Sequence, residues 1–88
     1  MQFEFDPRKS EINKAKHGID FVDAQALWKS SVVVLGAKDT FEKRYIAIGM
    51  IGRLHWSAII TYRRSMIRII SVRRSTPAEI ETYEENAA

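Results

Sequence analysis

Eight basic residues and no acidic one lie between positions 43 and 78, and these side chains are the best suited to chemistry. They are Lys43, Arg44, Arg53, Arg63, Arg64, Arg68, Arg73 and Arg74. Arginine keeps its charge at physiological pH and presents a planar fork of donors that matches a phosphate group. Held together on a rigid scaffold, such groups would bind a polyanion such as RNA or DNA. They could also stabilise the charge that builds on phosphorus during backbone cleavage.

The expected position of each arginine indicates whether it has a functional role or is a solvated surface charge. Arg68 and Arg73 interrupt an otherwise apolar strand, which favours function, because charged residues are rare in such surroundings. Arg53 and Arg64 lie in expected turns, where solvated charges are common. Arg73 and Arg74 are adjacent in one strand, so we expect them on opposite faces. The alternative for the whole set is a solvated strand face that keeps the sheet edge soluble.

Three residues are candidates for proton transfer, and each has a structural alternative. His17 could act as a general base near neutral pH, or it could bond the last carbonyls of a helix. Tyr83 could donate a proton or stack on a base, although its spacing from Ile80 favours core packing. Glu42 could act as a general base or pair with a neighbouring basic residue. The residues alone do not decide among these candidates.

Composition argues against several other kinds of site. The chain has two histidines and no cysteine, so it has no disulfide or thiolate metal site, and we expect no zinc site. No glycine-rich phosphate loop or paired-carboxylate signature is present. An enzyme of this composition should therefore work without a metal or bound cofactor. The cytoplasm is the expected compartment, since we find no signal peptide and no apolar run of membrane-spanning length.

Local patterns predict the elements that position these groups. The length of 88 residues and the net charge of +3 indicate one moderately basic domain, residues 1–88. Alternating polar and aromatic residues predict a short strand at residues 2–5. Asp6 as N-cap, followed by proline, and Gly18 as the closing residue predict a helix that ends near His17.

The rest of the chain predicts one more helix, four strands and a final helix. The helix should begin at Asp20 and carry an apolar stripe to residue 28. The strands are expected at residues 32–35, 44–50, 54–62 and 66–73, the first of them buried and the last inside the sheet. Thr76 and Glu79 form a capping box that opens the final helix. The order βααββββα indicates an α+β domain with a mainly antiparallel sheet of four to five strands, two N-terminal helices and one C-terminal helix.

A set of motifs with a specific order and spacing covers nearly the whole chain. They are Phe5-Asp6-Pro7, Lys9, Asn13, Lys16-His17-Gly18, Phe21, Ala24, Arg44-Tyr45, Ile48-Gly49, Thr61, Arg63, the run from Arg68 to Arg74, Glu79 and Tyr83-Glu84. Together they resemble the sequences of BrnT-type toxins. The chain departs from that family at Phe5, where tryptophan is common, and at Pro77-Ala78, where basic residues are frequent.

The resemblance implies a toxin of a type II toxin–antitoxin system with a RelE-like fold. Such a toxin cleaves RNA without a metal and thereby inhibits translation and growth. The implied chemistry is attack of a ribose 2′-hydroxyl on the neighbouring phosphate, which gives a cyclic phosphate and a free 5′-hydroxyl. The implied partner is a BrnA-type ribbon-helix-helix antitoxin in a two-plus-two complex, and the toxin would meet operator DNA only through this partner.

The resemblance also implies roles for individual residues. The basic active-surface positions of the family fall on Arg63, Arg68, Arg73 and Arg74. We expect these arginines to hold the scissile phosphate and to stabilise its transition state. Lys16 and Arg44 match further family positions, to which we assign RNA binding. The general acid and base stay open among the three candidates named above.

Two other functions would use the same basic residues. A non-catalytic nucleic-acid-binding module would hold phosphates through them with a steep salt dependence, although no expected helix carries the basic face of a major-groove reader. A protein-interaction domain would present them to an acidic partner. Cleavage of RNA by the purified protein would separate both from a ribonuclease.

Overall fold

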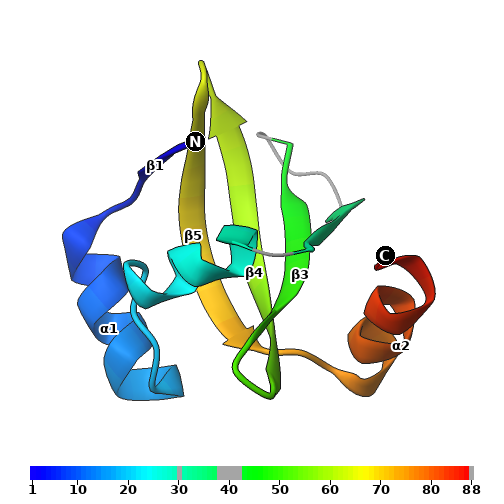
Figure 1. The fold of residues 1–88 in the computed structure, drawn as a ribbon. Helices are drawn as coiled ribbons and strands as arrows, with labels where there is room; N and C mark the ends of the chain where they lie inside the picture. Colours follow the sequence, from blue (N-terminus) through cyan, green and yellow to red (C-terminus); the bar gives the residue numbers. More distant parts are fainter. Residues whose placement is uncertain (30, 38–42, 88) are drawn as a thin grey trace.

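The computed structural model describes residues 1–29, 31–37 and 43–87, which form an α+β fold with a five-stranded sheet and three helices (Figure 1). In chain order the elements are β1 (Gln2–Glu4), α1 (Pro7–His17), the 3-10 helix η1 (Asp23–Lys29), β2 (Val33–Gly36), β3 (Tyr45–Ile51), β4 (Leu54–Arg63), β5 (Met66–Arg74) and α2 (Pro77–Asn86). The α+β class and the mostly antiparallel sheet are confirmed, whereas the RelE-like assignment stays a prediction.

The sheet has the strand order β1-β5-β4-β3-β2. β1 runs parallel to β5, and the other three pairings are antiparallel. β5 therefore lies inside the sheet, as its apolar composition predicts. The strand predicted at residues 32–35 is present as β2, but the prediction that it is buried is wrong, because β2 is an edge strand and Val34 is 38% exposed. A β-branched run favours a strand, but it does not reveal what covers that strand.

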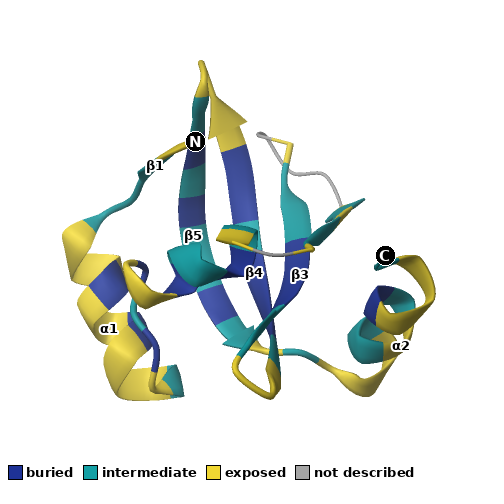
Figure 2. Cartoon of the chain, viewed as in Figure 1, coloured by how far each residue is buried: buried dark blue, intermediate teal, exposed yellow. Residues whose placement is uncertain are grey.

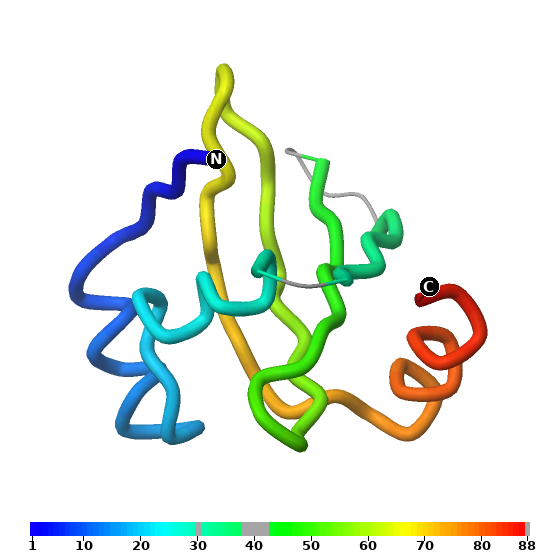
Figure 3. Tube along the Cα trace, in the orientation of Figure 1, coloured from blue at the N-terminus to red at the C-terminus, as the bar shows by residue number. Residues whose placement is uncertain are grey.

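α1 begins and ends where the local signals predict. The Asp6 carboxylate accepts a hydrogen bond from the Arg8 N–H at 2.9 Å, and Pro7 takes the first helical position. Gly18 closes the helix at φ 81°, a left-handed conformation that a residue without a Cβ adopts at little cost, and its N–H donates to the Lys14 carbonyl. α1 continues from β1 and lies beside the part of β5 that β1 does not pair with (Figure 3).

The second helix is a 3-10 helix and not the expected α-helix. Asp20 caps it as predicted, because its carboxylate accepts from the N–H groups of Val22 and Asp23 at 3.0 and 2.7 Å. The buried side chains in and just before this helix lie three positions apart, which matches the three residues per turn of a 3-10 helix. They are Phe21, Ala24 and Leu27. The apolar spacing therefore contained the signal for the tighter helix.

The sheet has two different faces. On one of them, which we call the core face, buried residues of β4 and β5 pack against η1, which crosses the sheet (Figures 1 and 2). The core includes Phe21, Ala24, Leu27, Ala58, Ile60, Ile69 and Val72. α2 packs over β3 at the opposite side of the domain from α1 (Figure 1). The second face, beside α2, is the one that carries the arginines described below.

Two tight hairpins join β3 to β4 and β4 to β5. Gly52 turns the first with φ 62°, as the sequence predicts. Arg64 turns the second with φ 58°, which is uncommon for a residue with a side chain. The second turn fixes Arg63 opposite Met66 and so sets the register of the two longest strands.

Candidate functional site

The register of β4 and β5 brings three arginines to the sheet face opposite the core face, which we call the basic face. Arg68 pairs with Thr61, and Arg73 pairs with Ser57. Thr61 and Ser57 lie four residues apart on β4, so they and their partners point the same way. Arg63 lies two residues beyond Thr61 and joins them on the basic face.

This grouping depends on a β-bulge in β5. The register shifts between Ile59 and Ile60 of β4, which leaves Ile70 of β5 without a partner residue. In a regular strand, side chains five residues apart point to opposite faces, so Arg68 and Arg73 would be separated. The extra residue brings them to one face. It also explains why β5 has buried residues at both odd and even positions.

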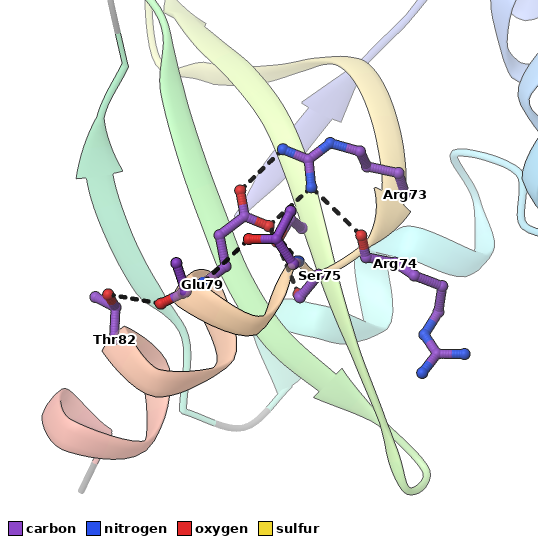
Figure 4. A network of polar contacts seen from close by, with 8 residues as sticks. Arg73, Arg74, Ser75, Glu79 and Thr82 are labelled. Atoms are coloured by element: carbon purple, nitrogen blue, oxygen red, sulfur yellow. Dashed lines mark hydrogen bonds and ion pairs between the residues drawn. The ribbon is translucent and has the colours of Figure 1, made fainter.

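Arg73 is held to α2 by a two-point ion pair with Glu79 (Figure 4). Nη1 lies 2.8 Å from Oε1 and Nη2 lies 2.9 Å from Oε2. Oε1 also accepts from the Ser57 hydroxyl and from the Thr76 N–H, both at 2.9 Å, and the Thr76 bond belongs to the predicted capping box. The bond from Arg73, with those from Thr76 and Ser57, lowers the pKa of Glu79 to about 2. The same ion pair raises the pKa of Arg73.

Arg73 keeps two donors for a ligand. Its guanidinium has five N–H groups, of which two bond Glu79 and a third donates to the Arg74 carbonyl at 3.3 Å. Among the described residues, no hydrogen bond uses the Nε–H or the second Nη2–H. These two groups lie side by side on one edge of the planar guanidinium. Glu79 therefore orients Arg73 and leaves it a donor pair that matches a phosphate.

A second row of polar residues crosses the basic face at Arg68. Its Nη1 lies 3.1 Å from Oε2 of Glu4, the residue opposite it on β1. On its other side Arg68 pairs with Thr61. Arg44 directly precedes β3, and the Thr61 hydroxyl donates to the carbonyl of the adjacent Lys43 at 2.8 Å. The buried Nε of Arg44 has no hydrogen-bond partner among the described residues, so Arg44 still has a donor that needs an acceptor.

Arg74 lies apart from the other three arginines of the predicted set. It pairs with Trp56 on the core face, and its guanidinium carbon is 5.6 Å from the ring centroid, within the range of a cation–π contact. Figure 4 shows its side chain extending away from Arg73. The alternation of Arg73 and Arg74 is as predicted, and it leaves three arginines on the basic face.

Lys16 and His17 line a groove of about 180 Å³ between α1 and β5. The lining residues are Lys9, Ile12, Asn13, Lys16, His17, Ile70 and Ser71. Sequence reasoning assigned no function to Lys9 or Ser71. The spacing of Lys9 and Lys16, seven positions apart in one helix, could have revealed Lys9, because such residues share a helix face. Ser71 follows the unpaired Ile70 and points to the basic face, because it pairs with Ile59.

Tyr83, the second candidate for proton transfer, is buried and its hydroxyl is hydrogen-bonded. Tyr83 is 7% exposed, its hydroxyl donates to the Ser31 carbonyl at 3.2 Å, and its ring meets the His55 ring edge-on at 5.4 Å. The Nε2 of His55 lies 2.9 Å from Oε2 of Glu84, within hydrogen-bond distance. Tyr83 is thus a packing residue in this structure. Glu42 lies outside the described residues.

Other parts of the described chain offer less for chemistry. A wider cavity of about 500 Å³ is lined mostly by apolar residues, namely Gly18, Ile19, Asp23, Ala26, Ile51, Leu54 and Trp56. Within residues 1–29, 31–37 and 43–87, no cluster of three or more His, Cys, Asp or Glu residues could hold a metal ion. In the same ranges, no helix is both long enough and apolar enough to cross a membrane.

A small α+β domain with grouped arginines on one sheet face has the features of a protein that acts on a phosphate-rich polymer. Residues 5–79 match the family described as "Ribonuclease toxin, BrnT, of type II toxin-antitoxin system", and the chain belongs to this family. The resemblance seen in the motifs is thereby confirmed. Membership makes the chain a ribonuclease toxin with an antitoxin protein as its partner. A search among curated proteins found no significant match.

Proposed function

We propose that this toxin is an endoribonuclease that cleaves RNA without a metal ion and binds the scissile phosphate on the basic face. The observation that carries the proposal is the grouping of Arg63, Arg68 and Arg73 on that face. Glu79 orients Arg73 so that its remaining donor edge is available to the phosphate. Fixed positive charge at that point would stabilise the extra negative charge of a pentacovalent phosphorane.

The proposed reaction is a transesterification within the RNA strand. A general base takes the proton of a ribose 2′-hydroxyl, and that oxygen forms a bond to the neighbouring phosphorus. The bond from phosphorus to the 5′-oxygen of the next nucleotide breaks, and this oxygen receives a proton from a general acid. The products are a 2′,3′-cyclic phosphate and a free 5′-hydroxyl, and no cofactor takes part.

Among the proton-transfer candidates, His17 has the best structural support. It lines the groove that opens beside Ser71 of the basic face, whereas the Tyr83 hydroxyl is bonded to Ser31 in a buried position. Lys16 in the same groove and Arg44, whose Nε has no hydrogen-bond partner among the described residues, are suited to binding RNA phosphates. Arg74 would have to act from the core face, so the proposal rests on the other three arginines.

Further parts of the proposal come from the family. The fold would be RelE-like, and the antitoxin would be a BrnA-type ribbon-helix-helix protein in a two-plus-two complex. Operator DNA would be bound only through that antitoxin. Cleavage of RNA in the cytoplasm would stop translation and growth.

Cleavage by the purified protein in the presence of EDTA tests this proposal. Labelled single-stranded RNA, and DNA of the same sequence, would be incubated with the wild-type protein and with Arg73→Ala. We expect RNA fragments with 2′,3′-cyclic phosphate and 5′-hydroxyl ends from the wild-type protein alone, and intact DNA from both. RNA that stays intact, or is cut only after a divalent metal is added, would overturn the proposal. Binding without cleavage would support the non-catalytic module instead.

A further inference from the structure

The groove between α1 and β5 collects positive charge next to the basic face. Lys9, Lys16 and His17 line it from α1, and its lining contains no carboxylate. Ser71 lines it from β5 and also points to the basic face, because it pairs with Ile59 on the same side of β4 as Ser57 and Thr61. The groove and the arginine-bearing face are therefore continuous at Ser71.

The lysines of this groove differ from the arginines in their partners. Arg68 is paired with Glu4 and Arg73 with Glu79, so part of their charge is already balanced within the protein. No ion pair within the described residues involves Lys9 or Lys16, and both side chains are exposed. The two lysines therefore keep their charge for an incoming anion, whereas part of the charge of Arg68 and Arg73 is balanced within the protein.

The size of the groove limits what it can hold. Binding pockets for whole small-molecule ligands have volumes of roughly 300–1,000 Å³. A space of about 180 Å³ is below that range, so it suits a compact charged group and not a complete nucleotide. A lysine ammonium is a compact charge on a flexible stem, and two of them can converge on one phosphate.

We propose that this groove binds a backbone phosphate of the RNA substrate, adjacent to the phosphate held by Arg73. Ser71 and Arg73 are two residues apart along β5, a distance of roughly 7 Å that one nucleotide of backbone can bridge. Lys9 and Lys16 hold the flanking phosphate, and the Ser71 hydroxyl can donate to it. The RNA then runs as a single extended strand from the groove across the basic face. This inference rests on the proposed ribonuclease function and adds the path of its substrate.

Binding of a non-cleavable RNA tests the groove separately from catalysis. The probe is a labelled single-stranded oligonucleotide with 2′-O-methyl groups at every ribose, in which the attacking oxygen is blocked. Its Kd would be measured by fluorescence anisotropy at several salt concentrations for the wild-type protein and for Lys9→Gln/Lys16→Gln. The matched control is Lys14→Gln, which lies on the same helix but pairs with Asp23 outside the groove.

We expect Lys9→Gln/Lys16→Gln to bind the probe about 10-fold more weakly at low salt, as is typical for the loss of a charged hydrogen bond. The slope of log K against log salt should fall by about 0.7, the value for one phosphate of a single strand. Lys14→Gln should match the wild-type protein. Equal Kd and slope in the double variant and in Lys14→Gln would overturn the inference, as would failure of the wild-type protein to bind the probe.

The two proposals fail in different ways. If the wild-type protein cleaves ordinary RNA while the double variant binds the 2′-O-methyl probe as well as Lys14→Gln does, the ribonuclease proposal stands and the groove proposal is wrong. If the wild-type protein binds the probe through the groove but cuts no RNA, the groove proposal stands without the catalytic one. Both lysines are exposed, so thermal unfolding of the double variant should match that of the wild-type protein.

Discussion

The side-chain amide of Asn13 forms both hydrogen bonds of a strand partner with the backbone of Val72. Its Nδ2 donates to the Val72 carbonyl at 2.9 Å, and the Val72 N–H donates to its Oδ1 at 3.2 Å. Nδ2 also donates to the Ile19 carbonyl at 2.8 Å. The strand pairing of β1 with β5 ends at Arg68, so Asn13 takes over at the edge of β5 and holds α1 there.

Replacing Asn13 should destabilise the protein strongly. Asn13→Ala removes three hydrogen bonds and leaves buried backbone groups of Val72 and Ile19 without partners. We expect the free energy of unfolding to fall by at least about 3 kcal/mol, since three buried groups lose their partners and each unsatisfied group costs about 1–3 kcal/mol. Urea denaturation measures this change. Lys14→Ala, at the next and exposed position, should change the free energy by less than about 0.5 kcal/mol.

Asn13→Asp separates hydrogen-bond direction from side-chain size. The ionised aspartate could accept from the Val72 N–H but could not donate to either carbonyl. We expect it to be at least as destabilising as Asn13→Ala at neutral pH and to recover part of the loss in acid. A variant as stable as the wild-type protein would contradict the role given to Asn13.

The ion pair of Arg73 and Glu79 should make stability depend on pH in acid. The folded pKa of Glu79 is lowered from 4.5 to about 2 by Arg73 and the bonds from Thr76 and Ser57. A lowered folded pKa contributes stability that is fully present above pH 4.5 and is lost as pH falls through about 2. Because the Arg73 side chain is 34% exposed, solvent screens the pair, and we expect a loss on the order of 2 kcal/mol.

Glu79→Gln tests this pH dependence. The variant should be less stable than the wild-type protein at pH 7, and the difference should shrink as the pH approaches 2. Chemical denaturation at a series of pH values measures both curves. Glu81→Gln, an exposed position on the same helix, is the control and should run parallel to the wild-type protein. A constant difference between Glu79→Gln and wild type at all pH values would show that the ion pair is not the cause.

The helix ends could be predicted from the sequence because their causes are local. Asp6 and Thr76 bond N–H groups two or three residues further along the chain, and Gly18 closes α1 on a carbonyl four residues back. Each cap residue satisfies backbone groups of its own helix turn, so a short window of sequence contains the whole interaction. The predicted hairpin at Gly52 is local in the same way.

The arrangement of the site could not be predicted because its causes are distant in the sequence. Arg68 and Arg73 share a face only because Ile70 is an extra residue in the ladder, and no glycine or proline in β5 marks that bulge. Asn13 meets Val72 across a separation of 59 residues. A one-residue shift of register would turn the arginines to the other face, so the site depends on tertiary pairing.

Arg73 lies on the basic face and Arg74 on the core face, so replacing them should affect RNA cleavage differently. Arg73→Lys keeps the charge but loses the planar fork, and we expect kcat for RNA cleavage to fall about 100-fold, as after removal of one transition-state donor. Arg74→Ala removes a side chain from the core face, next to Trp56, and should retain most of the activity. Single-turnover cleavage of RNA in EDTA measures both rates.

Folding must be separated from catalysis in this comparison. The Glu79 side chain is 14% exposed, so loss of its partner would leave a poorly solvated carboxylate. Arg73→Lys keeps a cation beside that carboxylate, so its thermal unfolding should lie close to that of the wild-type protein while its cleavage rate stays about 100-fold lower. Arg53→Ala, in the exposed β3–β4 turn, is the surface control. Equal loss of cleavage in Arg73→Lys and Arg74→Ala would contradict a site confined to the basic face.

The two remaining proton-transfer candidates in the described structure should also respond differently. His17→Gln removes the imidazole from the groove, and we expect kcat to fall about 100- to 10,000-fold with a flatter pH dependence near neutrality. Tyr83→Phe removes one hydrogen bond to Ser31 and should cost about 1 kcal/mol of stability while leaving the cleavage rate unchanged. Cleavage rates between pH 5 and 9, with melting curves for each variant, measure these effects.

Loss of cleavage in Tyr83→Phe but not in His17→Gln would indicate that α2 moves in the active state. Tyr83 lies one helical turn beyond Glu79, and its hydroxyl is bonded to a backbone carbonyl in a buried position. If Tyr83→Phe stayed folded but lost cleavage while His17→Gln kept it, the hydroxyl would have to reach the RNA. That would require α2 to move off β3 in the active state and to break the Arg73–Glu79 ion pair. Both guanidinium edges of Arg73 would then be open to phosphate, and Glu79→Gln should raise kcat, which distinguishes an opening helix from a fixed one.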